Sequence, residues 1–335
     1  MQSVAKESTS KKISKLLMDN VIILGIFILA VVVSILRPNF LGESNIRNLL
    51  GNTAIRFIIA VGVSGCLITK GTDLSAGRVA GFAACMAAIM LQRSDYVNRM
   101  IPGLPELPVF VVLLVVLAVC AVIGAINGSV VAFFKVPPFI ATLGMQTLVY
   151  GIALVSTGAQ PIGSLRREFT TLATGYIGNP IVSYIALIAL AVGTFMWVLY
   201  NKMRHGKYMY AIGGNEAAAE VAGINVNRTK VRIYTLAAML YGLCGFLLAA
   251  KSGGASVNTA MGYELEAIAG CTIGGVSVNG GVGKVSGILI GVLVFEVLKI
   301  AMQFMGLKSD YTYIVQGLVI IIAVALDLRK YLAKK

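Results

Sequence analysis

The sequence predicts an all-α polytopic membrane protein with about ten transmembrane helices. Hydrophobic residues make up 58% of its 335 positions and charged residues only 13%, whereas soluble proteins carry about 25% charged residues. The apolar residues gather in segments long enough to cross a membrane, separated by short polar stretches. A helix satisfies its own backbone hydrogen bonds within lipid, so these segments are predicted to be helices.

Ten apolar segments define the predicted helices. The first follows a polar stretch, residues 1–20, and has no small-residue cleavage site after it, so we interpret it as an uncleaved helix. The ten segments form a single membrane domain, residues 21–326, and a short polar tail, residues 327–335, follows. The predicted helices are residues 21–36, 54–69, 75–91, 109–134, 139–155, 181–200, 233–250, 265–276, 285–305 and 313–326.

The distribution of basic residues predicts the orientation. If the N-terminus lies in the cytoplasm, the inner segments hold 17 Lys and Arg and the outer loops hold 8. Cytoplasmic loops carry the excess of basic residues, so the chain is predicted to be N-in and C-in, with a large cytoplasmic loop at residues 201–232. The net charge of +14 is spread over these loops with little aromatic interleaving, which argues against nucleic-acid binding.

Two glycine-containing segments, residues 69–81 and 271–287, each join a short apolar segment to the next helix. Gly77–Gly81 (GRVAG) parallels Gly283–Gly287 (GKVSG), and the two lie six predicted spans apart, on the same side of the membrane. This similarity suggests an internal duplication, and glycine-interrupted segments in corresponding halves are typical of transporter sites. Neither segment fits GxxxxGK[ST], so no P-loop for ATP is present.

Glycines four residues apart predict close helix packing. They are Gly77/Gly81, Gly124/Gly128, Gly270/Gly274 and Gly287/Gly291. The five cysteines lie in apolar stretches without a CxxC pair and are interpreted as buried small residues. With a single histidine, His205, in a basic loop, the sequence offers no metal site, no cofactor site and no catalytic cluster.

A few polar or aromatic side chains lie within or beside the apolar segments, where polar groups are costly and often functional. Asp73, with Ser75 beside it, can line a translocation path or cap the following helix. Asn127 can bind a substrate hydroxyl or a neighbouring helix. Phe139 and Thr142 follow Pro137-Pro138 at helical spacing, and either a sugar-facing surface or core packing explains them.

Other charged residues are interpreted as structural. Glu296 and Lys299 are spaced i, i+3 and are expected to neutralise each other locally. Glu264 and Glu266 flank the outer end of a short helix and are expected to be solvated.

The stretch Gly213–Val226, GGNEAAAEVAGINV, predicts a short, mostly exposed cytoplasmic helix. Asn215 can cap it, Glu216 falls in its first turn, and Gly223 ends it. Either a connector or a docking element for a partner explains such a helix. Its predicted docking residues are Gly214, Asn215, Glu216, Ala217, Ala218, Ala219 and Gly223.

Four motifs together resemble the monosaccharide ABC importer permeases, the ribose, arabinose, xylose and galactose group. They are GTDLSAGR at 71–78, VPPFIATLGM at 136–145, GGNEAAAEVAGINV at 213–226 and GGVSVNGGVG at 274–283. The resemblance spans nearly the whole chain. Ribose-type members read GGIDLSVG at the first motif, so GTDLSAGR, together with the ending ALDLRKYLAKK, is similar to the galactose/methyl-galactoside branch.

The resemblance implies a homodimer in the bacterial inner membrane, with the sugar route at or near the dimer interface. It also implies a cytoplasmic ATPase with two fused nucleotide-binding halves, which docks on the loop at 213–226, and an extracytoplasmic sugar-binding protein. The chain itself would not be an enzyme.

Three alternatives differ in class or substrate. An ion-coupled secondary sugar transporter would need unpaired intramembrane carboxylates, for which Asp73 is the candidate. A membrane-embedded enzyme would need a catalytic cluster. An ABC permease for another pentose or hexose, such as ribose, would keep the same partners.

Overall fold

The computed structural model describes residues 21–178 and 182–332, and within these ranges its regular elements are thirteen helices. The helices are α2 (Val21–Leu36), α3 (Glu43–Ile68), α4 (Ala76–Met90), α5 (Val109–Ala132), α6 (Pro138–Thr157), α7 (Arg167–Thr174), α8 (Tyr184–Lys202), α9 (Arg204–Gly214), α10 (Glu216–Val221), α11 (Val226–Ser252), α12 (Tyr263–Ile273), α13 (Val285–Phe304) and α14 (Ser309–Leu332).

Each of the ten predicted segments contains a helix of the structure. Among the described residues, seven helices are long and apolar enough to cross a membrane, namely α3, α5, α6, α8, α11, α13 and α14. Helices α2 and α4 are apolar but shorter. Helix α12 has 11 residues, about 16 Å at a rise of 1.5 Å per residue, roughly half the thickness of a hydrocarbon core. Residues 1–20, 179–181 and 333–335 lie outside the described residues.

Several helices extend beyond the predicted apolar segments. Helix α3 begins at Glu43, so residues 43–53, predicted to be loop, form its first turns. Helix α11 begins at Val226, where the Asn225 side chain accepts a hydrogen bond from the backbone nitrogen of Arg228. Helix α14 continues through Leu332. Hydropathy marks where a helix lies in lipid, whereas caps and polar helix formers set where it starts.

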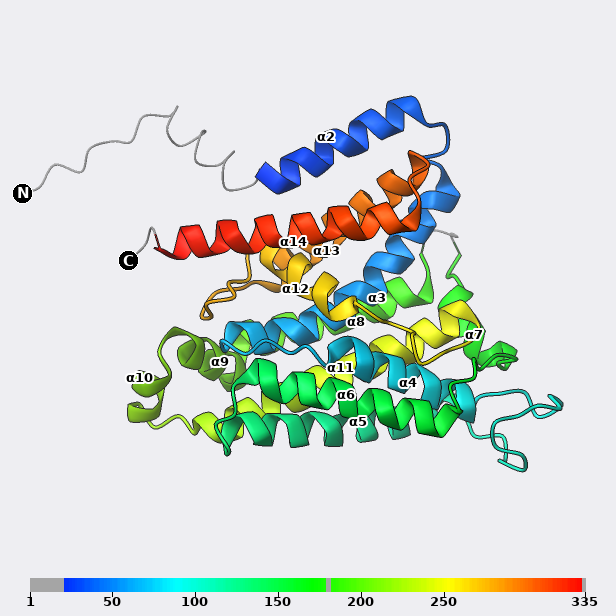
Figure 1. The fold of residues 1–335 in the computed structure, drawn as a ribbon, viewed down its shortest axis with the longest axis horizontal. Helices are drawn as coiled ribbons and strands as arrows, with labels where there is room; N and C mark the ends of the chain where they lie inside the picture. Colours follow the sequence, from blue (N-terminus) through cyan, green and yellow to red (C-terminus); the bar gives the residue numbers. More distant parts are fainter. Residues whose placement is uncertain (1–20, 179–181, 333–335) are drawn as a thin grey trace, which may run out of the picture.

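The helices pack in layers around α3 and α11, as Figure 1 shows. Helices α2 and α14 lie on one side of this pair, and α5 and α6 lie on the other. In the most apolar 18-residue stretch of α3, 89% of the residues are buried, whereas the corresponding share in α6 is 22%. The start of α2, the end of α14 and the helices α9 and α10 lie at one end of the molecule, and α7 lies at the opposite end (Figure 1). Both ends of the described chain therefore share a side with the 201–232 loop.

Glycines bring helix backbones into direct contact, which confirms the predicted close packing. A Cβ atom added at Gly274 would overlap the backbone of Gly287, and one added at Gly291 would lie 2.6 Å from the Gly274 nitrogen. Helices α5 and α11 approach equally closely, since a Cβ at Gly128 would lie 2.9 Å from the Val231 Cα. Contacts this close exclude any side chain at these positions.

Non-helical segments interrupt the bundle at three places, residues 69–75, 253–262 and 274–284. The first and third meet, because the Gly281 nitrogen donates a 2.8 Å hydrogen bond to the Ile68 carbonyl. The second lies along α4, where the Arg78 guanidinium donates to the Val257 carbonyl at 3.0 Å. Non-helical backbone in a membrane protein needs hydrogen-bond partners within the protein, and these contacts provide two of them.

We predict that Gly291→Val destabilises the protein by about 1–3 kcal/mol, because the new side chain would force α12 and α13 apart. The melting temperature in detergent measures this effect. Gly25→Val in α2 is the matched control, since a Cβ at Gly25 meets no described atom within 4 Å. Equal melting temperatures for the two variants would contradict the close packing of α12 and α13.

Candidate functional site

Helix α10 forms as the sequence predicts, with a cap at each end. The Asn215 side chain accepts a hydrogen bond from the Ala218 nitrogen at 3.1 Å, which confirms the predicted cap. At the other end Gly223 has a φ of +83°, a conformation that strongly favours glycine. The Ile224 nitrogen then donates to the Ala219 carbonyl at 3.1 Å, so the chain turns back towards α11.

The two faces of α10 differ in exposure. Ala217, Ala218 and Glu220 are exposed, and Val221 is 90% exposed. Ala219 instead packs inward in a small cluster with Ile212 and Val226. Ala219, one of the predicted docking residues, is therefore not on the exposed face of α10, because 100° per residue turns every third or fourth side chain to the inner face.

Helix α10 is also tied to its neighbours by charge. Both carboxylate oxygens of Glu216 lie 2.8 Å from the Lys230 ammonium nitrogen, which joins α10 to α11. The Gly214 carbonyl, at the end of α9, accepts a hydrogen bond from Lys70 at 3.3 Å. In α9, burial and the positive charge of Arg232 lower the pKa of His205 below its ordinary value. These contacts hold the short helix α10 against α9 and α11.

Four of the five predicted path residues lie together inside the bundle. The Asp73 carboxylate accepts hydrogen bonds from the backbone nitrogen and hydroxyl of Ser75, at 2.9 and 2.6 Å, and from the Tyr241 hydroxyl at 3.2 Å. The Asn127 amide donates to the Ser75 hydroxyl at 3.5 Å. Thr142 accepts from the Leu74 nitrogen at 3.1 Å. The cluster joins α4, α5, α6 and α11.

Burial distinguishes this cluster from an open channel wall. Asp73, Ser75 and Asn127 are each 2% exposed and Thr142 is fully buried, so the four side chains hold helices together in this conformation. The Asn127 carbonyl oxygen has no hydrogen-bond partner among the described residues. Phe139 differs from them, because 53% of its surface is exposed on α6, although its backbone carbonyl lies 3.3 Å from the Thr142 hydroxyl. The predicted path residues thus divide into a buried polar cluster and one exposed aromatic side chain.

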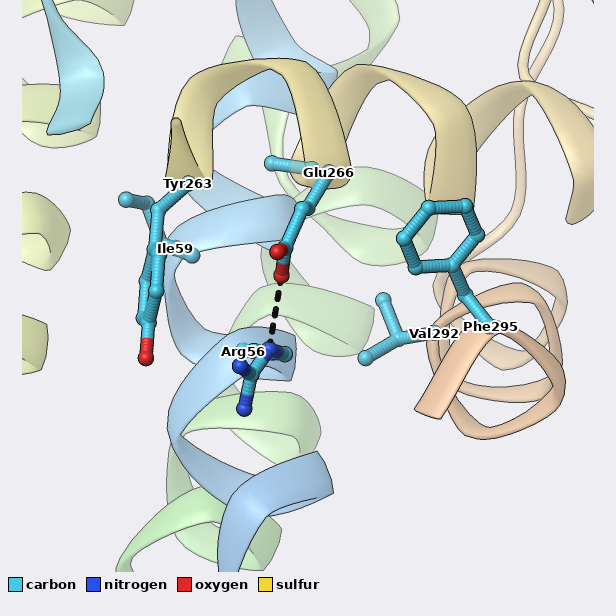
Figure 2. A pocket seen from close by; sticks show the side chains of 7 residues that line it. Arg56, Ile59, Tyr263, Glu266, Val292 and Phe295 are labelled. Carbon is cyan, nitrogen blue, oxygen red and sulfur yellow. Dashed lines mark hydrogen bonds and ion pairs between the residues drawn. The ribbon is translucent and has the colours of Figure 1, made fainter. Parts of the chain in front are cut away.

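A buried group of charges joins α3, α12 and α13. The Arg56 guanidinium lies 2.7 Å from Glu266 and 3.2 Å from Glu296, and Lys299 lies 2.8 Å from Glu266. Arg56 also lies over the ring of Tyr263, 4.7 Å from its centroid. Figure 2 shows Arg56 and Glu266 pointing toward each other in a small pocket that Tyr263, Val292 and Phe295 also line.

This charge group corrects two predictions. Glu266 is paired and largely buried, and Glu264 is 8% exposed, so neither is solvated. Lys299 pairs with Glu266 on α12, and not with Glu296 on its own helix. The sequence signal was present, since Arg56 and Lys299 are cations within apolar segments and such residues require partners. The partners are 210 and 33 positions away, beyond the reach of local spacing.

We predict that Arg56→Met destabilises the protein by about 3–5 kcal/mol, because it leaves the buried Glu296 without its cation. Lys299→Met should cost less, since Glu266 keeps Arg56. Adding Glu296→Gln to Arg56→Met should recover part of the loss. Melting temperatures in detergent measure all three variants, and an Arg56→Met variant that melts like the wild type would show that the charge group contributes no stability.

Comparison with known proteins shows the family to which this chain belongs. Residues 45–324 match the family described as branched-chain amino acid transport system / permease component. The galactose/methyl galactoside import permease protein MglC of Haemophilus influenzae is 43% identical over 325 residues, which cover 96% of this chain and 97% of the relative. MglC of Escherichia coli is also 43% identical, over 89% of this chain and 90% of the relative.

A second group of relatives carries a different name. The ribose import permease protein RbsC of Bacillus subtilis is 40% identical over 311 residues, 92% of each chain. Comparison with solved structures gives no match. The relatives confirm the resemblance inferred from the four motifs, and the chain belongs to this family of transport-system permease components.

Proposed function

We propose that this chain is the membrane subunit of an ATP-driven importer that moves galactose or a methyl galactoside into the cytoplasm. The observation that carries the proposal is the similarity over nearly the full chain to import permeases named for galactose, at 43% identity. Permeases named for ribose reach 40%. The first motif, GTDLSAGR at 71–78, separates this chain from the ribose pattern and supports the galactose branch.

The proposed topology has ten membrane-embedded helices, with both termini in the cytoplasm of a bacterium and the protein in the inner membrane. These helices are α2 to α6, α8 and α11 to α14. The basic residues support this orientation, since 17 fall on the proposed inner side and 8 on the outer. In this topology α9 and α10 face the cytoplasm and α7 faces outward. Residues 1–20 and the C-terminal segment from 327 onward flank the membrane domain.

The proposed partner on the cytoplasmic side is an ATPase with two nucleotide-binding halves. Helix α10 suits this role because its outer face, with Ala217, Ala218 and the exposed Val221, is low enough to enter a groove. The caps at Asn215 and Gly223 and the Glu216–Lys230 ion pair fix its direction. A helix anchored in this way can transmit movement of the partner as a rigid body.

Two further partners complete the proposal. A sugar-binding protein docks at the opposite end, around α7. A second copy of the chain forms a homodimer, and the sugar route runs at or near their interface. The exposed Phe139 on α6 is the predicted path residue that can face such a route, since an aromatic ring suits the apolar face of a sugar. The buried cluster of Asp73, Ser75, Asn127 and Thr142 would hold together the helices beside this route.

Transport by the reconstituted complex tests the substrate. Vesicles that hold this chain with its ATPase and sugar-binding protein should take up radiolabelled galactose only with ATP, and should favour galactose over ribose at equal concentration. The chain alone should neither bind ATP nor import sugar, because it has no Walker motif.

Each contrary result of this assay identifies a different error. Import of ribose with galactose ignored would show that the assigned substrate is wrong. Uptake by the chain alone, driven by a sodium or proton gradient, would instead support an ion-coupled transporter.

We predict that Ala218→Trp prevents the ATPase from docking, because the indole would stand on the exposed face of α10 without touching the membrane helices. Gly223→Val should weaken docking as well, because a β-branched residue disfavours a φ of +83° and the end of α10 would shift. Co-purification of the ATPase measures both effects. Wild-type co-purification and transport by Ala218→Trp would show that the loop is only a connector.

A further inference from the structure

We propose that residues 69–75, the segment between α3 and α4, carry movement from the ATPase-docking helices to α6. In this proposal Gly213 and Thr142 are positioning residues at the two ends of the segment. The inference rests on the proposed function, because it requires that an ATPase move α9 and α10. It adds the internal route by which that movement reaches the helix that bears Phe139.

At the cytoplasmic end, three backbones meet at Gly213. A Cβ atom added to Gly213 would lie 2.5 Å from the Gly281 nitrogen and closer still to the Ile68 carbonyl. The same carbonyl accepts the Gly281 hydrogen bond at 2.8 Å. The last turn of α9 therefore rests directly on the end of α3, and it cannot move inward without displacing residue 68.

Two side chains strengthen this junction. Lys70, the second residue after α3, donates to the Gly214 carbonyl at 3.3 Å, and Lys70 itself holds a left-handed backbone with φ of +60°. The Tyr210 hydroxyl of α9 donates to the Gly283 carbonyl at 2.8 Å. Helix α9 is thus bonded to both interrupting segments, 69–75 and 274–284.

At its other end the segment is bonded to α6 through one side chain. The Thr142 hydroxyl accepts a hydrogen bond from the Leu74 nitrogen at 3.1 Å. Its own proton can go to the Thr72 carbonyl at 3.2 Å or to the Phe139 carbonyl of α6 at 3.3 Å. Tyr241 holds the intervening Asp73 from α11. Thr69, Asp73 and Ser75 are at most 5% exposed, so every second side chain of the segment packs against the bundle, and a packed contact of this kind transmits displacement.

Within one copy of the chain, α6 is among the least enclosed of the helices bonded to this segment. In its most apolar 18-residue stretch, 22% of the residues are buried, against 89% in α3 and 72% in α11. A displacement of residues 72–74 would therefore move α6 before it moves the core helices. Phe139 lies three residues from Thr142 on α6, so the same displacement would change the position of Phe139.

The test uses the complete complex of chain, ATPase and sugar-binding protein in vesicles. Gly213→Ala inserts a methyl group at the α9 end, and Thr142→Val removes both hydrogen bonds at the α6 end while keeping the side-chain shape. Two controls make the same exchanges where they should not matter. Gly25→Ala has open space around it, and Thr194→Val loses only a bond to Leu190 within its own helix.

We expect both test variants to retain the ATPase on co-purification. The amount of sugar imported per ATP hydrolysed should fall by about fivefold or more relative to the controls, the lower range of coupling between linked sites. Melting temperatures of the purified variants check that they are folded, and Thr142→Val, which keeps the packing, provides the result if Gly213→Ala proves unstable.

Three outcomes would overturn the proposal. If folded Thr142→Val imports sugar at the control ratio, the segment does not carry the movement to α6. If Gly213→Ala loses the ATPase while Thr142→Val behaves as a control, the junction is part of the docking surface. If the wild-type chain itself does not bind an ATPase, the proposed function fails, and the internal route falls with it.

Discussion

The hydrogen bond from the Gly281 nitrogen to the Ile68 carbonyl joins the two segments that interrupt the membrane helices. A carbonyl at the end of a helix has lost its intrahelical partner, and within a membrane protein it must find another inside the protein. Gly281 supplies that partner, and Gly213 leaves room for the contact by having no side chain. The arrangement of α3, α9 and α13 around residue 68 depends on this one bond and on the glycines beside it.

The need for a partner within the protein also explains the buried charges that join α3, α12 and α13. Helix α12 is short, and its first turn, with Glu264 and Glu266, begins directly after the non-helical residues 253–262. A carboxylate near a helix N-terminus is stabilised by the helix dipole, yet a buried carboxylate also needs a cation. Arg56 and Lys299 provide the cations for Glu266 from the two flanking helices. The charges therefore hold the short helix between two long ones.

The sequence predicted much of the fold, because its strongest signals are local. Ten apolar segments correspond to ten helices, Asn215 caps α10, and the glycine pairs mark close contacts. The errors occur where the decisive partner is distant in the chain. The pairing of Glu266 with Arg56 and the inward position of Ala219 depend on how separate helices assemble, and no local spacing encodes that. Four of the five candidate path residues were recognised by their polarity, whereas the burial of these four comes from the packing of separate helices.

The proposed docking of an ATPase on the outer face of α10 can be tested by site-specific photocrosslinking. A photoreactive amino acid is placed at Val221, which is 90% exposed on α10, and separately at Ile35, which is 78% exposed on α2. Illumination of the assembled complex should join the ATPase to position 221 and leave position 35 without an ATPase adduct. Crosslinking of the ATPase at position 35 with none at position 221 would contradict the account.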